Sequence, residues 1–146
     1  MRRTGFATGG LCVLALAGAV GFVSQAAGQD KGKALPAEEL TKAFAADEKA
    51  AKAKYNDKPV LVEGAVLART EKGATLVTVT LKGHAKKGGG TYKVECRFAF
   101  TEEEEVLKVK PGDKVKIQGE SLGGLTGKEG GVGNDTVALV MCQFVK

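Results

Sequence analysis

Residues 74–81 read ATLVTVTL and residues 91–100 read TYKVECRFAF. Both stretches are rich in β-branched or aromatic residues that alternate with a period of two, which is typical of strands with one buried face. We expect the inner face of the later strand to carry Tyr92, Val94, Cys96, Phe98 and Phe100. Its outer face then carries Lys93, Glu95 and Arg97.

Three further strands are predicted around this pair, over residues 60–66, 114–120 and 135–146. Turn residues separate them at 70–73 and 110–113. Thr101 and Glu104 have the spacing of a capping box, so a short helix that buries Val106 and Leu107 should follow the third strand. Residues 82–90 (KGHAKKGGG) and 121–134 (SLGGLTGKEGGVGN) are predicted to be loops without regular structure.

Residues 36–55 consist of strong helix formers, with Pro36 suited to a first helical position. The pattern predicts one helix, ended by the segment 56–59, with an apolar face. That face carries Leu40, Phe44, Ala51 and Tyr55.

The order of these elements is that of one known architecture. It predicts a mainly β domain over residues 36–146: a five-stranded OB-fold Greek-key barrel with an N-terminal helix and a short helix between strands three and four.

The first 28 residues have the layout of a signal peptide. A basic start, Met1-Arg2-Arg3, precedes an apolar run over residues 11–23 and then small residues, so cleavage is expected after Ala26 or Gly28. Residues 29–35 follow as a flexible linker. The chain is therefore expected to be exported, to the periplasm or the extracellular space, and not to stay inserted in a membrane after cleavage. An uncleaved anchor is the alternative, and Sec and twin-arginine export both remain open.

Composition and charge exclude some classes of function but do not identify one. The chain has 146 residues, 43% of them hydrophobic, which suits a single globular domain. Export would remove Arg2 and Arg3, two of the 22 basic residues, and none of the 17 acidic ones, so the formal charge would fall from +5 to +3. With one histidine and no cluster of nucleophile and base, we expect no enzymatic activity, metal site or cofactor.

The basic segment between the second and third strands, together with the outer face of the third strand, is the candidate ligand site. It could hold a phosphate backbone or another anion, although a solvated loop has the same composition. The candidate residues are Lys82, His84, Lys86, Lys87, Lys93 and Arg97. Because Tyr92, Phe98 and Phe100 are expected in the core, this surface is expected to lack an aromatic platform for stacking bases.

The domain resembles the tRNA_anti-like family of small bacterial OB-fold proteins, which commonly carry signal sequences. The resemblance rests on AAKAKYNDK (50–58), VLVEGAV (60–66), VECRF (94–98), Leu107 followed by KPGDKVKIQG (110–119), and residues 137–142. These motifs are turn glycines, core alternation and two cysteines. The name of the family records a similarity to nucleic acid-binding domains and does not itself define an activity.

The resemblance also implies that the third and fifth strands lie side by side. Cys96 and Cys142, the two cysteines left after signal cleavage, are then expected to form a disulfide. The fifth strand is apolar on both faces, so its alternation does not aim Cys142 inward. Two buried thiols are therefore the alternative.

Two functions remain open at this point. The first is binding of single-stranded nucleic acid, an anionic envelope polymer or a small anion through the basic segment and the outer face of the third strand. The second is a protein-interaction or scaffold role in the cell envelope, through the glycine-rich loop or an edge of the barrel. Binding that weakens steeply with salt would favour the first.

Overall fold

A computed structural model describes residues 33–123 and 135–146. The predicted signal peptide, most of the predicted linker and most of the glycine-rich loop lie outside these residues. No helix in the described ranges is long and apolar enough to cross a membrane.

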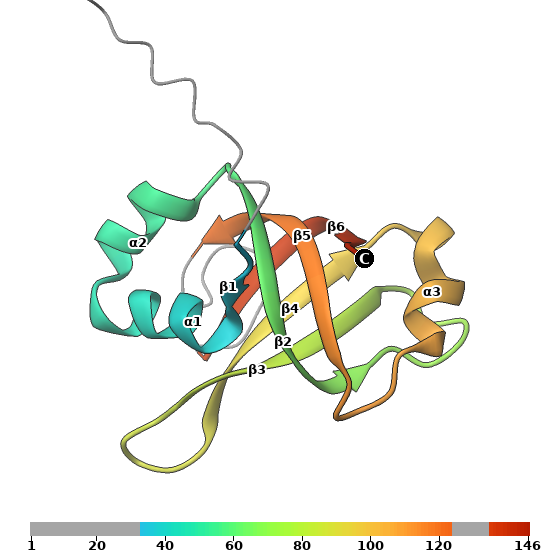
Figure 1. The fold of residues 1–146 in the computed structure, drawn as a ribbon, viewed down its shortest axis with the longest axis horizontal. Helices are drawn as coiled ribbons and strands as arrows, with labels where there is room; N and C mark the ends of the chain where they lie inside the picture. The colour runs from blue at the N-terminus through green and yellow to red at the C-terminus, as the bar shows by residue number, and fades with distance from the viewer. Residues whose placement is uncertain (1–32, 124–134) are drawn as a thin grey trace, which may run out of the picture. The chain divides into compact units, whose positions relative to one another are not determined.

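Five strands form a closed barrel, which confirms the predicted OB-fold architecture (Figure 1). Antiparallel pairing between the first and fourth of these strands closes the barrel, and the third pairs in parallel with the fifth. In chain order the strands are β2 (Pro59–Arg69), β3 (Val77–Ala85), β4 (Thr91–Phe98), β5 (Lys114–Gly123) and β6 (Thr136–Phe144).

The N-terminal helical region differs from its prediction in two ways. A two-residue strand, β1 (Leu35–Pro36), pairs in parallel with β2, so Leu35 is not part of a free linker. The helix is also broken at Asp47, whose extended backbone separates α1 (Ala37–Ala46) from α2 (Glu48–Tyr55). The Asp47 carboxylate accepts a hydrogen bond from the Ala50 amide at 3.0 Å, so the break doubles as the cap of α2.

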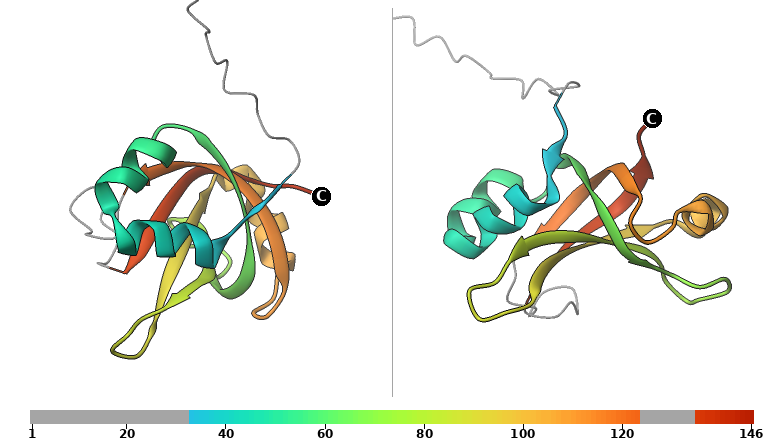
Figure 2. Two further views of the ribbon diagram at one scale, coloured as in Figure 1. Left: turned by 60° about the vertical axis from the view of Figure 1, so that its left-hand side comes forward. Right: turned by 60° about the horizontal axis from the view of Figure 1, so that its bottom comes forward.

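The two ends of the barrel are covered by different helices. Figures 1 and 2 show α1 and α2 on one side of the barrel and α3 (Glu103–Lys108) on the opposite side. Leu40, Phe44 and Ala51 are buried, as predicted, while Tyr55 is half-buried against the core.

The predicted capping box at Thr101 does not form. A 3-10 turn, η1 (Phe100–Glu102), precedes α3, and no side chain caps either element. Glu103 instead accepts a hydrogen bond from the Gly73 amide at 2.7 Å, which ties α3 to the turn between β2 and β3. Val106 is buried as predicted.

The alternation predicted for β4 holds over Val94, Cys96 and Phe98, which are all buried. It fails at Phe100, which is 65% exposed because β4 ends at Phe98 and the chain turns into η1. The loop predicted for residues 82–90 is also shorter than expected. β3 continues to Ala85, with a bulge after Lys82, and only residues 86–90 form the turn.

Candidate functional site

The outer faces of β3 and β4 place two lysines directly opposite each other. Lys82 is the cross-strand partner of Lys93, and both side chains are exposed. Like charges in directly opposed positions destabilise a sheet. Neither lysine has an ion pair among residues 33–123 and 135–146.

A third lysine lies in the same row across the strands. Lys114 of β5 is the partner of Ala65 on β2, and β2 pairs with β3 up to Val66 and Leu81. One residue further, the register places Ala65 beside Lys82. We call Lys82, Lys93 and Lys114 the lysine row. Lys114, like the other two, is exposed and has no ion pair within the described ranges.

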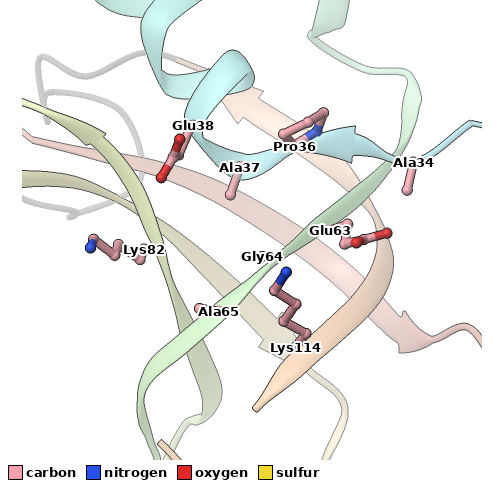
Figure 3. A pocket seen from close by; sticks show the side chains of 9 residues that line it. All are labelled: Ala34, Pro36, Ala37, Glu38, Glu63, Gly64, Ala65, Lys82 and Lys114. Atoms are coloured by element: carbon pink, nitrogen blue, oxygen red, sulfur yellow. The ribbon is translucent and has the colours of Figure 1, made fainter. Parts of the chain in front are cut away.

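A pocket with a volume of about 340 Å³ lies in the gap of this row. The Gly64–Ala65 segment of β2 runs between Lys82 and Lys114, while Pro36 and Ala37 line the side toward α1 (Figure 3). The hollow exists because β2 presents no large side chain here and its ladder with β3 has ended.

Gly64 keeps α1 close to this segment. A Cβ atom at position 64 would come within 3.0 Å of the Ala37 Cβ and 3.3 Å of the Leu81 Cβ. The start of α1 therefore packs directly over β2, and a larger residue would push it away.

The turn over residues 86–90 has one of its two lysines neutralised. Lys86 forms an ion pair with Asp135, and its ammonium lies 5.4 Å from the centre of the Tyr92 ring. The Lys86 amide donates to the Gly90 carbonyl at 3.1 Å, which closes the turn. Of the two turn lysines, Lys87 alone is exposed without an ion pair within the described residues.

Two other predicted site residues are also engaged with the fold. Arg97 forms an ion pair with Glu95 at 2.9 Å. The His84 amide donates to the hydroxyl of buried Thr41 at 2.8 Å, and the same hydroxyl donates to the Ala37 carbonyl at 2.9 Å. Thr41 thus fastens α1 to the bulge of β3.

The aromatic side chains follow the prediction, with one exception. Phe98 and Phe144 stack on each other with their ring centres 4.8 Å apart, and Tyr92 is half-buried beneath Lys86. Phe100 is the exception, exposed at the far end of β4 from Lys93. The lysine row therefore has no exposed aromatic ring beside it on β4.

The two cysteines are buried free thiols on neighbouring strands. A hydrogen bond with the Cys142 thiol, together with burial, raises the pKa of Cys96 well above its ordinary value. Met141 adopts a positive φ of 51°, and the register of β6 shifts at this point. The shift leaves Met141 76% exposed and turns the side chain of Cys142 inward. The disulfide stays a prediction.

No group of three His, Cys, Asp or Glu side chains within the described ranges is arranged to hold a metal ion. Of the six predicted site residues, the structure brings Lys82 and Lys93 together. Sequence reasoning missed Lys114, which reaches the site only through the register of β5 on β2. It also missed the exposure of Phe100, which continues the alternation of β4 in phase and so carries no local sign that the strand ends at Phe98.

One protein family matches the sequence of this chain. The model of the tRNA_anti-like family matches residues 11–129, so β6 lies beyond the matched span. A search of curated proteins gives no match.

Forty-three chains among the solved structures match. One is a protein from Klebsiella pneumoniae subsp. pneumoniae, named as a candidate nucleic acid-binding lipoprotein. It is 15% identical to this chain, with a TM-score of 0.52 over 77% of this chain and 92% of that one. At this identity the likeness establishes a shared fold.

Proposed function

The chain belongs to the tRNA_anti-like family, and on that premise we propose that it is an exported, non-enzymatic module that binds single-stranded nucleic acid through the lysine row. Export is supported by the layout of the first 28 residues and by the lipoprotein name of the Klebsiella structure. The absence of enzymatic activity remains part of the proposal.

One observation carries the proposal: Lys82 lies directly opposite Lys93, and neither forms an ion pair in the described structure. Such a pair costs stability unless an anion neutralises it. A nucleic acid backbone supplies one negative charge per nucleotide at a spacing that exposed lysines can follow.

The proposal narrows the predicted site to its part on the strands. Lys86 and Arg97 already have acidic partners, so the binding charge comes mainly from the outer surface of the strands. Lys87, at the tip of the turn, is a further cation near one end of this surface. Because no exposed ring lies beside the row on β4, binding should depend on charge and have little sequence preference.

A fluorescence anisotropy titration with a labelled oligothymidylate at low salt tests this function. We expect Lys82→Gln with Lys93→Gln to weaken binding about fivefold to tenfold, because each exposed contact contributes up to about 1 kcal/mol. The control is Lys42→Gln with Lys49→Gln, which removes the same charge from exposed positions on α1 and α2. Equal losses in the two variants, or no binding by the native protein, would refute the proposal.

A second candidate function is favoured by a separate surface. Phe100 is 65% exposed and Leu76 is 47% exposed, and the two residues flank the paired positions Val77 and Phe98. The neighbouring α3 begins with acidic residues, which would repel nucleic acid. This end of the barrel suits contact with a basic protein partner. A crosslinking experiment from position 100 in an envelope extract should capture one defined protein, and Phe100→Ser should abolish the capture.

A further inference from the structure

The pocket between Lys82 and Lys114 is a separate feature from the Lys82–Lys93 pair. It lies where the ladder between β2 and β3 ends, and Gly64 and Ala65 leave it open. Ligand pockets in proteins usually begin at about 300 Å³, so a volume of about 340 Å³ is enough for one small polar group with its attached sugar.

Two lysines and two glutamates line the pocket, so the lining itself carries no net formal charge. Two acids line it, but Glu63 faces Lys116, with 3.9 Å between the charged atoms, and Lys116 does not line the pocket. Glu38 is the other acid, and it is exposed. When Lys116 is counted, three basic and two acidic side chains lie in or beside the pocket, an excess of one positive charge.

The lysine row extends from the pocket across β3 to β4. Lys82 lines the pocket on one side and faces Lys93 on the other. A strand lying along the outer surface of β3 and β4 would therefore bring its end to the pocket, beside the Gly64–Ala65 segment of β2 (Figure 3).

We propose that this pocket binds the terminal phosphate monoester of a nucleic acid strand, an inference that rests on the proposed function. A phosphate monoester carries about −1.5 to −2 charges at neutral pH, whereas each internal diester carries one. Two lysine ammonium groups match the terminal group better than they match a diester. Glu38 opposes the binding and limits its strength.

The test compares oligothymidylates of one length that end in a 5′-phosphate, a 3′-phosphate or hydroxyl groups only. We expect the native protein to bind one phosphorylated strand about two- to fivefold more tightly than the hydroxyl-ended strand, the size of one or two exposed charge contacts. Lys114→Gln should remove this preference, so that the phosphorylated and hydroxyl-ended strands bind with equal affinity, and it should weaken binding of every strand by the loss of one contact in the lysine row.

Two variants serve as controls. Lys110→Gln removes one exposed charge outside the pocket and should keep the preference. Glu38→Gln should increase it, a gain that general damage to the fold would not produce.

The possible failures are distinguishable. Equal affinity for all three strands would overturn the terminal-phosphate assignment and leave the proposed function standing, while no binding of any strand would overturn both. Competition with thymidine 5′-monophosphate identifies the source of the phosphate. If the mononucleotide abolishes the preference at a concentration near the dissociation constant of the strand, the pocket binds free phosphate monoesters and the assignment to a strand end is wrong.

Discussion

The side chains on the inner and outer surfaces of the barrel differ in whether they have interaction partners. On the inner surface, Cys96 is covered by its neighbours and meets the thiol of Cys142. On the outer surface of the same strand, Lys93 faces a second lysine, and no described acid pairs with it. Packing accounts for the inner surface. The like-charged lysine row lowers the stability of the fold, so its presence is better explained by a function than by packing.

The largest effect on stability should come from the inner cysteine pair. In an oxidising compartment we expect Cys96 and Cys142 to be joined, which should stabilise the fold by about 2–4 kcal/mol. The two thiols would lose their protons and two electrons to a thiol–disulfide oxidant of that compartment. Denaturant unfolding with and without reductant measures the difference.

Reductant should leave the unfolding of a Cys142→Ala variant unchanged, which controls for other effects of the reagent. Two alkylatable thiols in unreduced, denatured protein taken from its native compartment would contradict the disulfide.

The next effect concerns the contact between α1 and the inner side of β3. A Cβ atom at Gly83 would lie 2.7 Å from the Thr41 side chain and 2.7 Å from the Tyr92 carbonyl oxygen. We expect Gly83→Ala to cost about 1–3 kcal/mol of unfolding free energy. Gly88→Ala is the matched control, since nothing lies within 4 Å of a Cβ there, and it should change stability by less than about 0.5 kcal/mol. Similar losses in the two variants would mean that α1 does not pack here.

A smaller loss is expected where an outer cation is already paired. Lys86→Ala removes the ion pair with Asp135 and the contact with Tyr92, so it should cost about 0.5–1 kcal/mol. Lys87→Ala, one residue along the turn, should cost nothing measurable in thermal unfolding. If Lys86→Ala left stability unchanged but weakened oligonucleotide binding as much as the loss of Lys82 and Lys93, the distinction between paired and unpaired lysines would fail.

The smallest effect on stability should come from the unpaired row itself. Lys82→Gln with Lys93→Gln removes a like-charge contact, so unfolding free energy should stay constant or rise by up to about 0.5 kcal/mol at low salt. Calorimetry at two salt concentrations checks this, because screening should reduce any gain. A loss above 1 kcal/mol would assign these lysines a structural role.

More residues of the inner surface than of the outer surface could be placed correctly from the sequence. Alternation placed Val94 and Phe98 correctly because burial imposes a period of two on a regular strand. It could not place Cys142, because the bulge at Met141 depends on how β6 fits between β4 and β5. Lys114 escaped prediction for a related reason: it is 32 positions from Lys82 in the sequence, and the strand register decides that the two lysines line one pocket.

The basic turn shows the converse error. The sequence concentrates cations at Lys86 and Lys87, which made this turn part of the predicted site. The acid that neutralises Lys86 is Asp135, at the start of β6, which no local pattern could have brought there.

The salt dependence of binding tests the central claim most directly. For a single-stranded oligonucleotide, each lysine–phosphate contact contributes about 0.7 to the slope of the logarithm of the binding constant against that of the salt concentration. We predict that Lys82→Gln with Lys93→Gln lowers this slope by about 1.4 relative to the native protein. Lys42→Gln with Lys49→Gln should leave it unchanged. A slope that is the same in all three proteins would contradict the account.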